Sequence, residues 1–184
     1  MHRLDQISRK AECRSEYYQG VIYAKSCGNA VHSVITVNLA AELRQALKKR
    51  RCFVYSTDLR LRVTPSGLYT YPDVMVICDE PFFCDDQKDT VTNPVLIVEV
   101  LSNSTEAHDR GFKLAQYRKL DSLREYVLVS QHEPRIERYL RQPDDPWLYN
   151  ESSGLDGSLR MESVGCRIAL AEIYDKVEFA AGTG

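Results

Sequence analysis

The sequence predicts an α/β (α+β) protein whose mixed β-sheet is flanked by helices. Residues 94–130 are ordered as strand, helix and strand, which predicts a parallel strand pair joined by a crossover helix. Apolar residues recur at helical spacing from Val31 to Leu47 and predict the longest helix. Pro94–Leu101 is almost entirely aliphatic, which is typical of a central strand covered on both faces.

The 184 residues predict one domain, 1–184, because no repeat, low-complexity tract or linker divides the chain. A hydrophobic content of 43% and a charged content of 27% are those of an ordinary globular protein. No apolar run approaches the roughly 20 residues that span a membrane. The N-terminus lacks the apolar core of a secretory signal. We therefore expect a cytoplasmic protein that does not bind a membrane.

Six cysteines stand at positions 13, 27, 52, 78, 84 and 166. None forms a C-x-x-C pair, and no histidine pair has the spacing of zinc ligands, so a zinc site is not expected. Cys52 and Cys78 lie in apolar, strand-like runs. We expect both to be buried thiols, because a disulfide framework is not expected in a chain of this size without a secretory signal.

The formal net charge of −2 argues against a strongly basic, non-specific nucleic-acid binder. Basic residues do gather at 48–51, which reads Lys-Lys-Arg-Arg. The favoured interpretation is a positive helix end that complements the helix dipole. The alternative is a basic patch that serves a nuclease.

The first half of the chain alternates extended and helical signals. Residues 3–12 predict a short amphipathic helix, and extended segments are expected on both sides of Gly20. A Gly-Asn turn precedes the helix Val31–Leu47. Arg51–Val63 alternates as a strand.

The second half adds further strands. A turn at 64–67 leads to the strand Tyr71–Cys78, and a polar, acidic loop at 79–93 precedes the central strand. His108–Leu120 is expected to be helical, after turn and cap residues. The remaining predicted elements are strands at Arg124–Ser130, Arg135–Arg141 and Trp147–Glu151 and a helical turn at Ala171–Tyr174.

Two carboxylates stand where burial is expected. Asp73 lies at the head of the first apolar strand, and Glu99 lies inside Pro94–Leu101. A buried carboxylate is costly unless it is paired or binds a metal. Mg²⁺ binds through one or two carboxylates and keeps positions open for water and phosphate. Asp73 and Glu99 are therefore predicted metal ligands and catalytic residues. The alternatives are an internal ion pair for Glu99 and a simple Pro-Asp turn for Asp73.

A further predicted catalytic residue, Lys113, lies on the following helix. Asp109, Lys113 and Tyr117 are spaced four apart and share one helix face. Lys113 would orient the attacking water or stabilise charge on the phosphate, with Asp109 and Tyr117 as accessory residues. The alternative is a solvated ion pair between Asp109 and Lys113.

Two residues from the N-terminal part complete the predicted site. Glu16, just before the first extended run, is a candidate catalytic residue that would support the metal or its water. His32 starts the long helix and is a candidate for phosphate contact or proton transfer. An ordinary surface or packing role is the alternative for each. No nucleophile elbow, Walker A motif or dinucleotide-binding glycine motif points to another chemistry.

Several segments resemble the bacterial Uma-type endonuclease family: YYQGVIYA, VHSVITVNL, YPDVMVICD, PVLIVEVLSNSTEAHDRGFKLAQYRKLDSLREYVLVSQ and the late LAEIY. That family is similar to the restriction-endonuclease-like PD-(D/E)XK nucleases. The resemblance implies a mixed sheet flanked by helices, bound Mg²⁺ or Mn²⁺, and DNA, less readily RNA, as substrate.

The resemblance also assigns residues. Asp73 matches the family's metal-binding aspartate, and Glu99 matches its acidic residue on the next strand. Leu101 stands where the usual E-x-K lysine would be, and the resemblance implies that Lys113 replaces that lysine from the following helix. The remaining correspondences are Glu16 to an early glutamate, His32 to a histidine at the helix start, and a departure at Gln19, where the family often has Asp.

Two functions remain open from the sequence. The first is a Mg²⁺- or Mn²⁺-dependent DNA endonuclease, for which analogy suggests a homodimer because cutting both strands needs two sites. The second is a catalytically weak or inactive module that keeps the nuclease fold and binds nucleic acid or takes part in assembly. The acidic net charge favours this second function.

Overall fold

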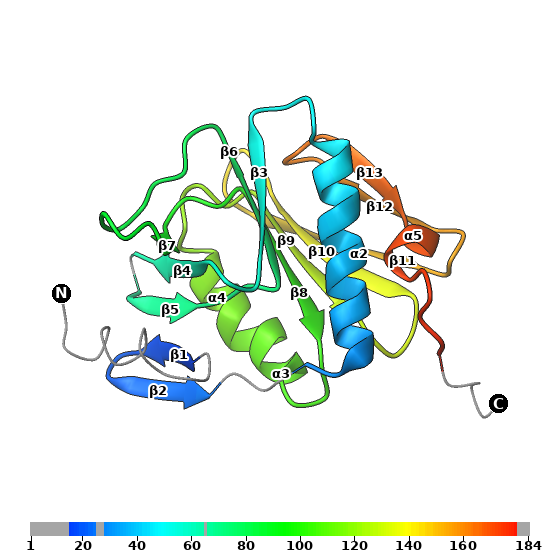
Figure 1. The fold of residues 1–184 in the computed structure, drawn as a ribbon, viewed down its shortest axis with the longest axis horizontal. Coiled ribbons are helices and arrows are strands. Elements are labelled where there is room, and N and C mark those ends of the chain that lie inside the picture. Colours follow the sequence, from blue (N-terminus) through cyan, green and yellow to red (C-terminus); the bar gives the residue numbers. More distant parts are fainter. Residues whose placement is uncertain (1–14, 25–27, 65, 180–184) are drawn as a thin grey trace.

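A computed structural model describes residues 15–24, 28–64 and 66–179 of the chain. At its centre is a mixed sheet of six strands (Figure 1). The strand order is β11 (Trp147–Ser153), β10 (Arg135–Arg141), β9 (Glu125–Ser130), β8 (Leu96–Leu101), β6 (Val74–Cys78) and β3 (Cys52–Ser56). β8 and β9 run parallel, whereas the other neighbours are antiparallel.

Two smaller sheets complete the described part of the chain. The larger of them has the order β2 (Val21–Ala24), β1 (Ser15–Tyr18), β5 (Leu68–Thr70), β4 (Arg60–Val63) and β7 (Thr90–Val91). The smaller is a hairpin of β12 (Ser158–Met161) and β13 (Cys166–Ala169).

The long helix α2 (Ala30–Ala46) covers one face of the six-stranded sheet. Asn29 caps its N-terminus, because its side chain accepts a hydrogen bond from the His32 backbone N–H at 2.9 Å. Ile35, Leu39 and Leu43 are fully buried against the sheet, and each contributes about 2 kcal/mol through burial. The hairpin β12–β13 and the short helix α5 (Leu170–Ile173) lie beside α2 (Figure 1).

The crossover between the parallel strands β8 and β9 covers the opposite face. It is one continuous helical segment composed of α3 (Glu106–His108), the π turn η1 (Asp109–Lys113) and α4 (Leu114–Tyr117). Alternate residues of β8 point to opposite faces. Ile97 and Leu101 pack with Tyr117 on the crossover side, and Val98 packs in the core under α2. Glu99 therefore points towards the crossover helix.

The predicted mixed sheet with flanking helices is confirmed, including the parallel strand pair and its crossover. The prediction of one strand over Arg51–Val63 is wrong. A turn with Thr57 at φ 30° divides this segment into β3 and β4, which belong to different sheets. The acidic loop 79–93 contains the short strand β7, and the hairpin β12–β13 was not predicted. The predicted helix 3–12 lies outside the described residues.

The expectation of two buried thiols at positions 52 and 78 is also wrong. Cys52 and Cys78 are direct partners in the antiparallel ladder of β3 and β6, and they form a disulfide. Both are only half-buried. Strand register brings them together, and register is not visible in the separate runs of the sequence. None of the helices in the described ranges is long and apolar enough to cross a membrane.

Candidate active site

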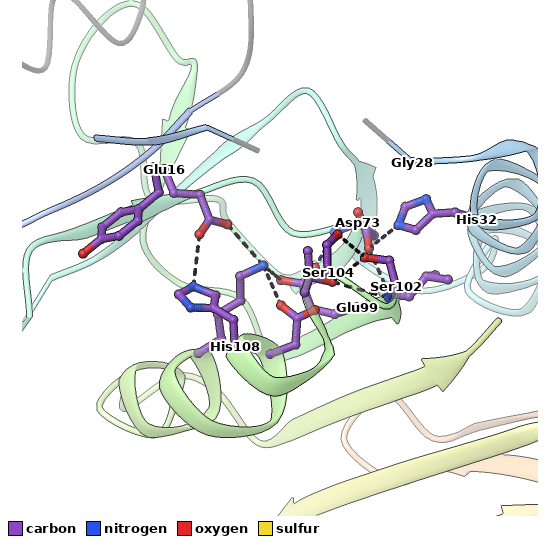
Figure 2. Close-up of a pocket in the computed structure, with 13 residues that line it drawn as sticks. Glu16, Gly28, His32, Asp73, Glu99, Ser102, Ser104 and His108 are labelled. Atoms are coloured by element: carbon purple, nitrogen blue, oxygen red, sulfur yellow. Dashed lines mark hydrogen bonds and ion pairs between the residues drawn. The ribbon is translucent and has the colours of Figure 1, made fainter. Parts of the chain in front are cut away.

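A pocket of about 310 Å³ lies where β6 begins, β8 ends and α2 starts (Figure 2). The crossover helix and the β1–β2 hairpin supply its remaining walls. Six of the seven sequence-predicted site residues line it: Glu16, His32, Asp73, Glu99, Asp109 and Lys113. The seventh, Tyr117, is buried behind it and contacts Glu99.

Asp73 and Glu99 meet at the floor of this pocket. Asp73 directly precedes β6, and Glu99 lies in the neighbouring antiparallel strand β8. The Val100 N–H donates to Asp73 Oδ2 at 2.9 Å, and the Asp73 N–H lies 3.4 Å from Glu99 Oε2. The two residues are 3% and 2% exposed. Two strands of one sheet therefore fix two carboxylates side by side.

The crossover helix supplies the partners of Glu99. Lys113 Nζ lies 3.2 Å from Glu99 Oε1, and the Tyr117 hydroxyl donates to the same oxygen at 2.8 Å. Burial raises the pKa of Tyr117 well above its usual value, and the Glu99 charge raises it further. Tyr117 therefore remains a hydrogen-bond donor that holds one Glu99 oxygen, while Oε2 is directed towards Asp73.

Lys113 is a buried cation among three carboxylates. Besides Glu99, its Nζ lies 3.1 Å from Glu16 Oε1 and 2.9 Å from Asp109 Oδ1. Burial alone would lower the pKa of the ammonium, but the charges of Glu99, Glu16 and Asp109 outweigh burial and raise it well above 10.5. Lys113 thus donates hydrogen bonds at neutral pH and cannot accept a proton. The Asp109–Lys113 pair is present, but it is buried rather than solvated.

Glu16 reaches the pocket from within β1, not from a position before the strand. Its Oε1 accepts a hydrogen bond from Thr70 Oγ1 at 2.6 Å and also faces the Lys113 ammonium. Its other oxygen, Oε2, faces His108 (Figure 2). Burial would raise its pKa, but His108, Lys113 and Thr70 together lower it to about 2. Glu16 is therefore an anion at neutral pH. At 5% exposure it is not the surface glutamate of the alternative interpretation.

His108 is a pocket residue that the sequence analysis did not predict. Its Nε2 lies 3.5 Å from Glu16 Oε2. His108 precedes the π turn Asp109–Lys113, whose backbone hydrogen bonds join residues five apart rather than four. The fifth residue then lies on the same side as the first, so His108 and Lys113 both face Glu16. A search at α-helical spacing misses this pair.

His32 enters the pocket from the first turn of α2. Its Nε2 lies 3.1 Å from Asp73 Oδ2. The backbone of Gly28 passes close to the imidazole ring, because a Cβ added to Gly28 would lie 2.7 Å from His32 Nδ1. Glycine at position 28 therefore leaves room for the ring orientation that contacts Asp73.

The donor set favours a hard cation. The described ranges contain no group of three or more His, Cys, Asp and Glu side chains arranged to hold a metal. Asp73 and Glu99 supply carboxylate oxygens, and Mg²⁺ binds through one or two carboxylates with water in its other positions. Carboxylate and water also suit Mn²⁺. The residues present therefore fit either ion.

Residues 1–170 match the Uma2 family model, which describes a putative restriction endonuclease. The chain belongs to the Uma2 family. Two curated relatives come from Synechocystis sp. and are described as uncharacterized proteins. The chain is 39% identical to sll1609 over 149 residues, covering 81% of this chain and 84% of the relative. It is 38% identical to slr1290 over 168 residues, covering 90% and 86%.

A solved structure has the same fold. The crystal structure of a putative nuclease belonging to DUF820 from Anabaena variabilis matches with a TM-score of 0.75 and 17% identity, covering 95% of this chain and 98% of that chain. The predicted family resemblance and fold class are thereby confirmed. Membership of the Uma2 family indicates a nuclease, whose substrate is a nucleic acid.

Proposed function

We propose that the protein is a Mg²⁺- or Mn²⁺-dependent endonuclease that hydrolyses phosphodiester bonds of DNA. One observation carries the proposal: Asp73 and Glu99 lie side by side in a pocket whose only described lysine, Lys113, contacts Glu99 at 3.2 Å. Two fixed carboxylates and one fixed ammonium are the groups needed to bind a divalent cation and a phosphate together.

Asp73 and Glu99 would hold the metal. When bound, the metal neutralises negative charge on the phosphate and lowers the pKa of a bound water. His32 contacts Asp73, and Tyr117 donates to Glu99, so both carboxylates are oriented by neighbouring side chains. Such supporting contacts hold ligands in position before the substrate arrives.

Lys113 and Glu16 would act on the reacting groups. The Lys113 ammonium would donate to a phosphate oxygen or to the attacking water, which places positive charge where negative charge develops. Glu16 holds the ammonium at 3.1 Å and can accept a hydrogen bond from water, because it is ionised at neutral pH. Asp109 is a positioning residue that fixes Lys113 from its own helix.

Cleavage of supercoiled plasmid by the purified protein tests this function. We expect nicked and linear DNA with Mg²⁺ or Mn²⁺, no cleavage with EDTA, and a loss of at least about 100-fold in Asp73→Ala, because a divalent ion stabilises the reacting charge by several kcal/mol. Asp144→Ala is the matched control, since Asp144 is exposed in the β10–β11 turn. Cleavage that survives both EDTA and Asp73→Ala would sink the assignment.

One observation favours a second candidate, a nuclease-fold module that binds nucleic acid without cutting it. Lys113 already neutralises part of the charge on Glu16, Glu99 and Asp109, so the cluster is partly compensated without a metal. Titration calorimetry separates the candidates: the endonuclease binds Mn²⁺ and loses this binding in Glu99→Gln, whereas the module shows no Mn²⁺ binding.

Substrate and assembly form the remaining parts of the proposal. We expect DNA to be cleaved in preference to RNA of the same sequence. We also expect a homodimer, because cutting both strands needs two sites. Light scattering of the purified protein, with and without duplex, measures the assembly directly.

A further inference from the structure

Basic side chains gather at the end of α2 that is distant from the pocket. Lys48 and Lys49 follow the helix and are exposed, and Arg160 and Arg167 are exposed on the β12–β13 hairpin. Arg50 joins the two parts. Its Nη2 donates to the Gly165 carbonyl at 2.9 Å, and its Nη1 donates to the Val164 carbonyl. These five side chains, Lys48, Lys49, Arg50, Arg160 and Arg167, are called the distal basic surface.

The positive charge of this surface is only partly cancelled by the exposed carboxylate of Glu162. Arg160 and Arg167 are direct partners in the antiparallel ladder, a position where like charges destabilise a sheet. Glu162 is shared, since its Oε1 lies 3.8 Å from Arg160 Nε and 3.6 Å from Arg138 Nη1. The surface is thus cationic in a chain whose net charge is −2. A bound anion would offset the repulsion.

The helix dipole alone does not account for the surface. The dipole acts within the last turn of a helix, but Arg160 and Arg167 belong to a hairpin far along the chain. A hollow of about 440 Å³ is lined by hairpin residues that include both arginines and Glu162. The cation cluster therefore extends beyond what the end of α2 requires.

Helix α2 is one straight element (Figure 1), and the pocket and the distal basic surface lie at its two ends. His32 lies in the first turn of α2 and lines the pocket, and Lys48 follows the last turn. A helix of 17 residues is about 25 Å long at its usual rise. That length equals about 7 base pairs of duplex at about 3.4 Å each. The distance suits a duplex, which is straight over this length.

The solvent-facing stripe of α2 between the two ends carries no described carboxylate. It consists of Ser33, Val37, Ala41 and Arg44, all exposed. Glu42 is half-buried beside it. A polyanion that follows this stripe therefore meets no exposed negative side chain of α2 itself.

We infer that the distal basic surface binds the phosphate backbone of the duplex that flanks the cleavage site, about 7 base pairs from the pocket. This inference rests on the proposed function, because it takes DNA as the substrate. Lys48 and Lys49 contact phosphates as point charges, and Arg160 and Arg167 extend the contact onto the hairpin. Such contacts position the duplex and are independent of base sequence.

Salt-dependent binding tests the inference. Binding of a duplex of about 24 base pairs is measured with EDTA, which prevents cleavage, over a range of salt concentrations. The plot of log K against log salt has a negative slope. In Lys48→Glu/Lys49→Glu we expect this slope to become shallower by about 1.8, because each lost phosphate contact removes about 0.9 from its magnitude. Lys88→Glu/Lys119→Glu is the control. It changes net charge equally, and its lysines are exposed on other elements, one before β7 and one after α4. Its slope should match the wild type.

Two outcomes overturn the inference. An equal decrease of the salt slope in the two double variants would show a general effect of net charge on DNA binding. An unchanged slope in Lys48→Glu/Lys49→Glu, together with lost binding of polyglutamate, would assign the surface to an acidic polypeptide.

Plasmid cleavage is assayed in parallel, so that failure of the endonuclease and failure of the distal basic surface can be told apart. A changed slope without metal-dependent cleavage defeats only the endonuclease, and Asp73-dependent cleavage with an unchanged slope defeats only the distal surface.

Discussion

Lys113 is the residue on which the candidate site depends electrostatically. Lys113 is 4% exposed, and its ammonium lies within 3.2 Å of oxygens from Glu16, Glu99 and Asp109. Removing one partner of a buried ion pair leaves an uncompensated charge, which costs more than the pair itself contributes. Three carboxylates share this lysine, so its loss would leave three buried negative charges together.

Lys113→Met should therefore lower the free energy of unfolding by about 3–5 kcal/mol at neutral pH. The deficit should shrink as the pH falls, because protonated carboxylates need no cation. Urea unfolding measures both effects. Lys119→Met, at an exposed position after α4, is the matched control and should change stability by less than about 0.5 kcal/mol. A change in Lys113→Met as small as in the control would mean that the cluster is not ionised.

The residue types of the site could be predicted from the sequence, but their contacts could not. Asp73 and Glu99 were predicted because a carboxylate beside or within an apolar strand needs a partner. Lys113 was predicted from its position on the next helix. His108 was missed because the π turn changes the spacing at which helical residues share a side. Gly28 was missed because its role depends on the close approach of the His32 ring.

The crossover helix carries a glycine inside its π turn, and this glycine has no packing role. A Cβ added to Gly111 meets no atom within 4 Å, whereas a Cβ added to Gly165, at φ 58°, would lie 2.7 Å from Arg50 Nη1. Alanine is favoured over glycine in a helix because it loses less backbone entropy on folding.

Gly111→Ala should raise the free energy of unfolding by up to about 1 kcal/mol and leave cleavage unchanged. Gly165→Ala should change the free energy of unfolding in the opposite direction. It should destabilise by about 1–3 kcal/mol, because alanine is strained at positive φ and displaces Arg50. Thermal unfolding of the two variants gives the comparison. Destabilisation by Gly111→Ala would contradict the helical backbone assigned to the π turn.

At the level of elements, the apolar pattern of a segment predicted whether it forms a helix or a strand, but not which strands pair. The strand pair β8 and β9 and its crossover were predicted because their apolar runs are long and their order is local. Arg51–Val63 was predicted as one strand because β3 and β4 have similar alternation on either side of Thr57. The Cys52–Cys78 disulfide depends on the register of two strands that are 26 residues apart. Pairing of that kind is a tertiary property.

At the scale of the whole molecule, the candidate site joins the two larger sheets. Glu16 comes from the five-stranded sheet, whereas Glu99 comes from the six-stranded sheet. Lys113, on the crossover helix, contacts both glutamates. Figure 1 shows this helix beside both sheets. The same ionic cluster thus serves the pocket and the attachment of the β1–β2 hairpin, so its protonation should appear in the stability of the whole protein.

The pKa of Glu16 gives the sign and the pH range of this effect. Folding lowers this pKa from 4.5 to about 2. The native state therefore binds fewer protons than the unfolded state in that interval, and the stabilisation is complete above pH 4.5 and is lost as the pH falls towards 2. A shift of this size corresponds to about 3 kcal/mol.

Glu16→Gln should accordingly lose about 3 kcal/mol of stability at neutral pH and progressively less in acid. Glu178→Gln, at an exposed position near the C-terminus, should follow the wild type throughout. Urea unfolding at a series of pH values measures the difference. A constant difference between wild type and Glu16→Gln from neutral to acid pH would show that the Glu16 carboxylate does not carry its charge in the native state.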